Sequence, residues 1–136
     1  NISFWRDSKI PDSKANPQSW HYSFKKFAAR DLNKRFKKNY KTNMDDYSWA
    51  GWAAVKMTSD TVARTKIISA KNMLNYLKTK LSFDGQKGSD MNFRVTGQLR
   101  QLILLVEDNK VIAEAPIRGI AKPPTLESLG ILDCSQ

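Results

Sequence analysis

Five consecutive aliphatic residues, Leu102 to Val106, constrain the fold of this chain more than any other stretch. They run into Glu107-Asp108-Asn109-Lys110, a polar segment of the kind that forms tight turns, and a second apolar run follows as far as Ile117. The pattern predicts a hairpin of two strands, 99–107 and 110–117, with Asp108-Asn109 at the apex of the turn.

The first of these strands is apolar on both faces. Because side chains alternate along a strand, Ile103 and Leu105 point to one side, and Leu102, Leu104 and Val106 point to the other. A strand of this kind is expected to be covered on both faces. Few other elements are expected in the chain, so we predict that a partner covers Leu102, Leu104 and Val106.

The segment before the hairpin predicts a long first helix. Asn16-Pro17 places a capping side chain before a proline at the first helical position. From Trp20 to Tyr40, aromatic and aliphatic residues recur at three or four positions, which is the spacing of one buried helical face. We therefore expect a first helix over 17–40 with an aromatic inner side.

Two further helices are expected before the hairpin. Asn43 and the pair Asp45-Asp46 predict a capped and negatively charged N-terminus, so the second helix is expected to run from 47 to about 64. The third is expected from 69 or 70 to about 79. The predicted fold class is α+β, with three helices packed on a small antiparallel, hairpin-based sheet. One domain, 1–136, is predicted, with an extended arm at 1–15, a helical part at 16–81, a β-hairpin region at 89–118 and a tail at 119–136.

Positive charge is concentrated in one segment. Residues 25–41 hold eight Lys or Arg against one Asp, whereas 82–136 carry six positive and seven negative residues within a total of +10. On the expected helix, five of the basic residues share one face and are the predicted partner-binding residues: Lys26, Arg30, Lys34, Lys37 and Lys41.

This basic face is either a solvated surface or a contact for an acidic protein, a nucleic acid backbone or anionic lipid. Nucleic acid is disfavoured, because the aromatic residues lie on the buried side and do not interleave with the lysines as a base-stacking platform requires. A larger acidic protein or multi-subunit enzyme complex is the expected partner.

No catalytic, cofactor-binding or metal-binding residues are predicted. His21 is the only histidine, which leaves no pair of histidines for a metal site, and Cys134 is the only cysteine, which excludes an internal disulfide. No run approaches eighteen apolar residues, so no membrane span is expected. The chain begins at Asn1, which fits a mature protein with its signal segment removed or a trimmed fragment.

Several motifs together resemble a known family. They are Trp20-His21, the Leu32–Phe36 segment, the Trp-rich stretch 49–55, and Phe93-Arg94 followed by GQLRQ at 97–101. In this order they look like the C-terminal third of type I periplasmic solute-binding proteins of the branched-chain amino acid type. The match is to the group found beside quinoprotein (PQQ-dependent) alcohol dehydrogenases. Proteins of that family have two α/β lobes and run to roughly three times this length.

The resemblance implies a non-enzymatic, periplasmic or otherwise extracytoplasmic role. The leading hypothesis is an accessory subunit that is derived from a solute-binding protein and docks on a larger complex, such as a quinoprotein, cytochrome or respiratory enzyme. The alternative is a fragment of an ABC transporter's solute-binding protein that still binds a small organic ligand. In that case Arg94 and Arg100 are the residues expected to pair with a carboxylate.

Overall fold

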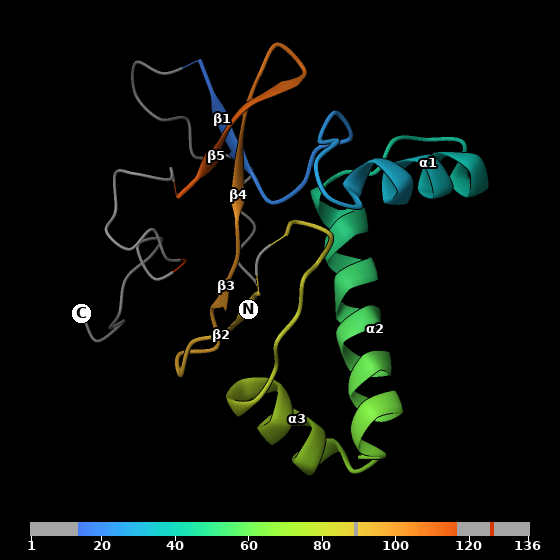
Figure 1. Ribbon diagram of the computed structural model, residues 1–136, viewed down its shortest axis with the longest axis vertical. Coiled ribbons are helices and arrows are strands. Elements are labelled where there is room, and N and C mark those ends of the chain that lie inside the picture. Colours follow the sequence, from blue (N-terminus) through green and yellow to red (C-terminus); the bar gives the residue numbers. More distant parts are fainter. Residues whose placement is uncertain (1–13, 89, 117–125, 127–136) are drawn as a thin grey trace.

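The computed structural model describes residues 14–88, 90–116 and 126, which form three helices and two small antiparallel sheets (Figure 1). The helices are α1 (Ala29–Tyr40), α2 (Asp46–Thr65) and α3 (Ala70–Thr79). The strands are β1 (Asn16–Gln18), β2 (Asn92–Phe93), β3 (Leu99–Arg100), β4 (Ile103–Glu107) and β5 (Lys110–Ala115). The predicted α+β class is therefore confirmed. Most of the predicted arm and tail lies outside the described residues.

Strand β4 is the centre of the larger sheet, whose order is β1-β4-β5. Leu104 lies opposite Gln18 on β1 and opposite Glu114 on β5, and both pairings are antiparallel. Asp108 and Asn109 both have positive φ, at 46° and 60°. Two successive residues with positive φ form the turn whose twist suits a two-residue hairpin. The predicted turn is thus confirmed.

The prediction that a partner covers Leu102, Leu104 and Val106 is wrong. All three side chains are buried in the chain's own core, and Leu104 is 0% exposed. They share one core cluster with Trp20, Phe24 and Trp49, so residues of this chain supply the cover that the sequence pattern did not anticipate. The opposite face of β4, with Ile103 and Leu105, is half-buried.

The predicted helix over 17–40 is wrong in its first half. Residues 16–18 form the edge strand β1, and the helix begins only at Ala29. Trp20 and Phe24 are spaced as on a helix, yet they lie in a turn region closed by the Phe24 N–H donating to the His21 carbonyl at 3.0 Å. Non-local contacts hold this segment, because the Trp20 backbone N–H and the Ser19 hydroxyl both donate to the Asp46 carboxylate, at 2.6 and 2.7 Å.

The expected strand 99–107 is divided in two. β3 pairs only with β2, and β4 pairs with β1 and β5. Between them the Leu102 carbonyl accepts a hydrogen bond from the Lys87 Nζ at 2.9 Å. A side chain from a loop takes the place of a neighbouring strand at this position, so the ladder is interrupted there.

The core is built around two stacked tryptophans. The rings of Trp20 and Trp49 are 5.8 Å apart and nearly parallel, with 8° between their planes, and Phe24 meets Trp20 edge-on. Both indole N–H groups have acceptors: Asn33 for Trp20 at 3.0 Å, and the Gly85 carbonyl for Trp49 at 3.1 Å. The first bond joins the turn region to α1, the second joins α2 to the loop after α3, and the ring stack links the two pairs.

Candidate functional site

Helix α1 presents the basic face. Figure 1 shows α1 projecting from the upper end of α2, on the side away from the sheets. Arg30, Lys34 and Lys37 fall within about 60° of one another around the helix axis at 100° per residue, and Lys41 follows as the C-terminal cap of the helix. All four are exposed. The described residues contain no hydrogen-bond or ion-pair partner for the side chains of the three lysines. The shared face is therefore an exposed cationic surface.

Lys26 does not belong to this surface. It precedes α1, and its ammonium group forms an ion pair with Glu114 on β5. Arg30 lies within 3.5 Å of the neighbouring Asp31, which partly neutralises it. Two exposed residues that the prediction left out, Arg35 and Lys38, extend the cationic surface around the helix.

Arg94 and Arg100 lie in the β2–β3 region. Arg94 is 2% exposed, and its backbone closes the turn between the two strands. Arg100 donates from Nη1 to the Asn92 side chain at 2.9 Å and to the Phe93 carbonyl at 3.0 Å. These bonds join β3 to β2, so the Arg100 guanidinium has a structural role in this sheet.

A fully buried lysine occupies the loop 84–88. Lys87 is 0% exposed and donates to the Gln101 side-chain oxygen and the Leu102 carbonyl, both at 2.9 Å. Its nitrogen also lies 3.9 Å from the centroid of the Trp49 ring. Two acceptors and one aromatic face are favourable partners for an amino group in a core. The side chain thereby joins the loop to α2 and to the start of β4.

Burial shifts the pKa values of two side chains near Asp46, Lys87 and His21. It lowers the pKa of Lys87 well below the usual value, and the negative charge of Asp46 opposes that shift. Burial also lowers the pKa of His21, again against Asp46. The His21 Nδ1 accepts from the Ser23 backbone N–H at 3.2 Å and lies 2.8 Å from the Ser23 hydroxyl. That hydroxyl accepts from the Val111 N–H at 3.0 Å, so His21 supports the contact with β5.

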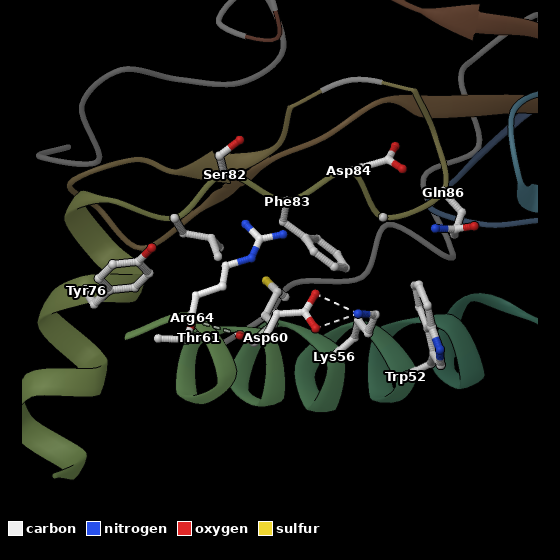
Figure 2. Close-up of a pocket in the computed structure, with 13 residues that line it drawn as sticks. Trp52, Lys56, Asp60, Thr61, Arg64, Tyr76, Ser82, Phe83, Asp84 and Gln86 are labelled. Carbon is white, nitrogen blue, oxygen red and sulfur yellow. Dashed lines mark hydrogen bonds and ion pairs between the residues drawn. The ribbon is translucent and has the colours of Figure 1, made fainter. Parts of the chain in front are cut away.

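An open pocket of about 200 Å³ lies between α2 and residues 81–86 (Figure 2). Lys56, Asp60 and Arg64 line it from α2, and Phe83 and Gln86 line it from the facing segment. Neither Arg94 nor Arg100 is among the lining residues. Any ligand bound here therefore meets a different arginine from those that the sequence suggested.

Within the described residues, the structure contains no cluster of three or more His, Cys, Asp or Glu side chains arranged to hold a metal ion. In the same part of the chain, no helix combines the length and the apolar character that crossing a membrane requires.

Comparison with solved structures shows what the fold is similar to. The chain is similar to a periplasmic ligand-binding protein of a branched-chain amino acid ABC transporter from Burkholderia xenovorans LB400, with a TM-score of 0.64 and 19% identity. The likeness covers 74% of this chain but only 29% of that protein. This chain therefore has the fold of one part of a type I binding protein. No protein-family model and no curated protein matches it.

Sequence reasoning missed two features of these regions. One is the buried Lys87, whose only local signal is its place between two glycines with positive φ, Gly85 and Gly88. The other is the charged row of the pocket, for which the spacing of Lys56, Asp60 and Arg64 at i, i+4 and i+8 was an available signal.

Proposed function

We propose that the chain is a non-catalytic, extracytoplasmic module of the solute-binding-protein type that docks on a larger acidic protein or enzyme complex through α1. The observation that carries this proposal is the exposed cationic surface of α1 on a fold that matches only part of a binding protein. A two-lobed binding protein encloses its ligand between its lobes, and this chain spans about 29% of the length of its structural neighbour. A role shared with additional polypeptide is therefore favoured over ligand capture by the chain alone.

Charge supports α1 as the docking surface. A row of lysines without acidic partners raises the local concentration of an acidic protein and speeds its association, at little cost in stability. Lys34, Lys37, Lys38 and Lys41 meet this description. Their attraction to a partner weakens as salt screens it, with a screening length of about 8 Å at physiological ionic strength.

The partner is proposed to be an extracytoplasmic enzyme complex. The motif resemblance points to the group of binding proteins found beside quinoprotein alcohol dehydrogenases, and a quinoprotein, a c-type cytochrome or another respiratory enzyme is the partner that follows by association. In this setting the chain contributes binding and assembly, and the partner contributes the chemistry.

Purification from the native source at low and high salt tests the docking proposal. We expect a stoichiometric acidic partner at low salt that is lost at about 0.5 M salt, in keeping with screening of exposed charges. A Lys34→Glu, Lys37→Glu variant is expected to lose the partner, and a Lys71→Glu, Lys78→Glu variant on α3 is expected to retain it. A chain that elutes alone and monodisperse at every salt concentration would contradict the proposal.

A second function, binding of a small organic ligand as part of a transporter's solute-binding protein, is favoured by one observation. The pocket between α2 and residues 81–86 is lined by Arg64, whose guanidinium group can pair with a carboxylate.

A further inference from the structure

A second open pocket of about 200 Å³ lies between the segment that follows β1 and the start of α2. Its lining includes Gln18, His21 and Tyr22 from the first segment, and Asn43 and Asp46 from the second. Two of the described lining residues are acidic, and none of them is lysine or arginine. In a chain with a net charge of +10 this lining is an exception, and its sign favours a cation as the ligand.

Asp46 is the buried acidic residue of this pocket, with 7% of its surface exposed. Its Oδ1 accepts two hydrogen bonds, from the Ser19 hydroxyl at 2.7 Å and from the Trp20 N–H at 2.6 Å. Its Oδ2 accepts none from the residues that the structure describes, and no ion pair among those residues includes Asp46. The unused acceptor capacity of the carboxylate therefore lies on Oδ2. A buried carboxylate without a counter-charge is costly, and a cation in the pocket would offset that cost.

The groups around Asp46 leave its negative charge in place. The His21 Nδ1 accepts from the Ser23 N–H at 3.2 Å, and burial lowers the pKa of His21, so the ring adds no charge to the lining at neutral pH. The Lys87 nitrogen forms its hydrogen bonds elsewhere, and Lys87 does not line the pocket. The N-terminus of α2 carries about half a positive charge, which is less than the full charge of one carboxylate, and the Asp45 side chain caps it.

We propose that this pocket binds a primary ammonium group, whose nitrogen donates to the Asp46 Oδ2. An ammonium ion presents three donors from one point, and the side-chain oxygens of Gln18 and Asn43 supply further acceptors in the same lining. A guanidinium group pairs best through two parallel bonds to both carboxylate oxygens, and Oδ1 of Asp46 is already occupied. The pocket shares no lining residue with the cationic surface of α1, so either function can fail while the other holds.

Three probes that share a butyl chain test the proposal: n-butylamine, n-butylguanidine and n-butanol. Each is titrated into the intact chain while its backbone amide signals are followed by NMR. We expect n-butylamine to shift the signals of residues 18–22 and 43–46, n-butylguanidine to bind several-fold more weakly, and n-butanol to leave these signals unchanged. A fourth probe, Nα-acetyl-lysine N-methylamide, carries the same ammonium group on a peptide. Tighter binding of this probe than of n-butylamine would identify a lysine side chain of another protein as the occupant, and equal or weaker binding would identify a free amine.

Two variants locate the site. Asp46→Asn retains an oxygen for the bonds from Ser19 and Trp20 but replaces Oδ2 by an amide nitrogen, and it is expected to weaken n-butylamine binding about tenfold, in line with loss of a charge-assisted hydrogen bond. Asp60→Asn removes the same charge about 21 Å further along α2 and is expected to bind as the unaltered chain does.

The amide spectrum of each variant reports whether its fold is retained, and the comparison of n-butylamine with n-butanol on the unaltered chain needs neither variant. Absence of shifts with n-butylamine, equal binding of n-butanol, tighter binding of n-butylguanidine, or undiminished binding by a folded Asp46→Asn variant would each overturn the proposal.

Discussion

Lysine occurs in two opposite settings in this molecule. On α1 and at its C-terminal cap, Lys34, Lys37 and Lys41 are exposed and have no side-chain partner among the described residues. In the loop 84–88, Lys87 is fully buried, and its nitrogen bonds two oxygens and lies over a tryptophan ring. The contrast shows that one residue type serves two purposes here. The exposed lysines provide a positive surface charge that can attract an acidic partner. The buried Lys87 holds the loop 84–88 in place, and part of that loop lines the pocket beside α2.

The largest expected loss of stability comes from removing the Trp49 ring, which stacks on Trp20 and contacts the Lys87 nitrogen. Trp49→Ala is expected to lower the free energy of unfolding by about 3–5 kcal/mol, because the stack, the indole hydrogen bond and the lysine contact are lost with a large buried volume. Val55→Ala, on the exposed side of the same helix, is expected to stay within about 0.5 kcal/mol. Urea denaturation measures both, and a loss below about 1 kcal/mol for Trp49→Ala would show that the stack does not organise the core.

Replacing either of two glycines by alanine is expected to change the stability of the chain, in opposite directions at the two positions. A Cβ at Gly85 would lie 2.0 Å from the Met91 Cε and 3.1 Å from the Trp49 ring, at a φ of +59°, so Gly85→Ala is expected to destabilise the chain by about 1–3 kcal/mol. Gly51 on α2 has no atom within 4 Å of its Cβ position, and Gly51→Ala is expected to stabilise the helix by about 0.5–1 kcal/mol. Thermal unfolding of the two variants tests this pair, and equal shifts of Tm would contradict the packing of the loop.

The pKa of Lys87 predicts a pH dependence. Because burial holds this pKa below the usual 10.5, the unfolded chain binds more protons than the folded chain between the two values. Stability then rises with pH in that window, by up to about 1.4 kcal/mol per pH unit, and is lost as pH falls. Denaturation from pH 7 to 10 is expected to show a steeper rise for the unaltered chain than for Lys87→Met. Identical slopes would mean that Lys87 stays fully charged in the folded state.

The smallest expected effect on stability belongs to α1. Lys34→Glu with Lys37→Glu is expected to change the free energy of unfolding by no more than about 0.5 kcal/mol per site, because both side chains are exposed. Circular dichroism during denaturation measures this. A larger loss would place these lysines in the packing of the fold and remove the main support for a docking surface.

Short-range sequence patterns predicted part of this fold. The rest depends on contacts between residues that are far apart in the sequence. The hairpin turn at Asp108-Asn109 depends on neighbouring residues and was correctly predicted. The start of α2 was predicted to within one residue, but its cap is Asp45, which accepts from the Ser48 N–H at 2.9 Å, and not Asn43. Trp20 and Phe24 also followed a helical spacing. However, their segment is held by Asp46, 26 residues from Trp20, so periodicity misassigned it.

Contacts between residues far apart in the sequence also limit how well the candidate sites could be predicted. The exposure of the α1 lysines followed from their shared helical face. The burial of Lys87 did not, because its surroundings come from Trp49, Gln101 and Leu102, which lie 14 or more residues away in the chain. Arg94 and Arg100 were chosen for their charge and motif, and only the pairing of β2 with β3 reveals that Arg100 bonds within that sheet.

Lysine labelling followed by mass spectrometry tests the contrast between the two settings most directly. The folded chain is treated with an amine-acetylating reagent, and the rate of modification is measured at each lysine. We expect Lys34, Lys37, Lys38 and Lys41 to react at the rate of free lysine and Lys87 to remain unmodified until the chain unfolds. Modification of Lys87 at the same rate as the α1 lysines would contradict the account.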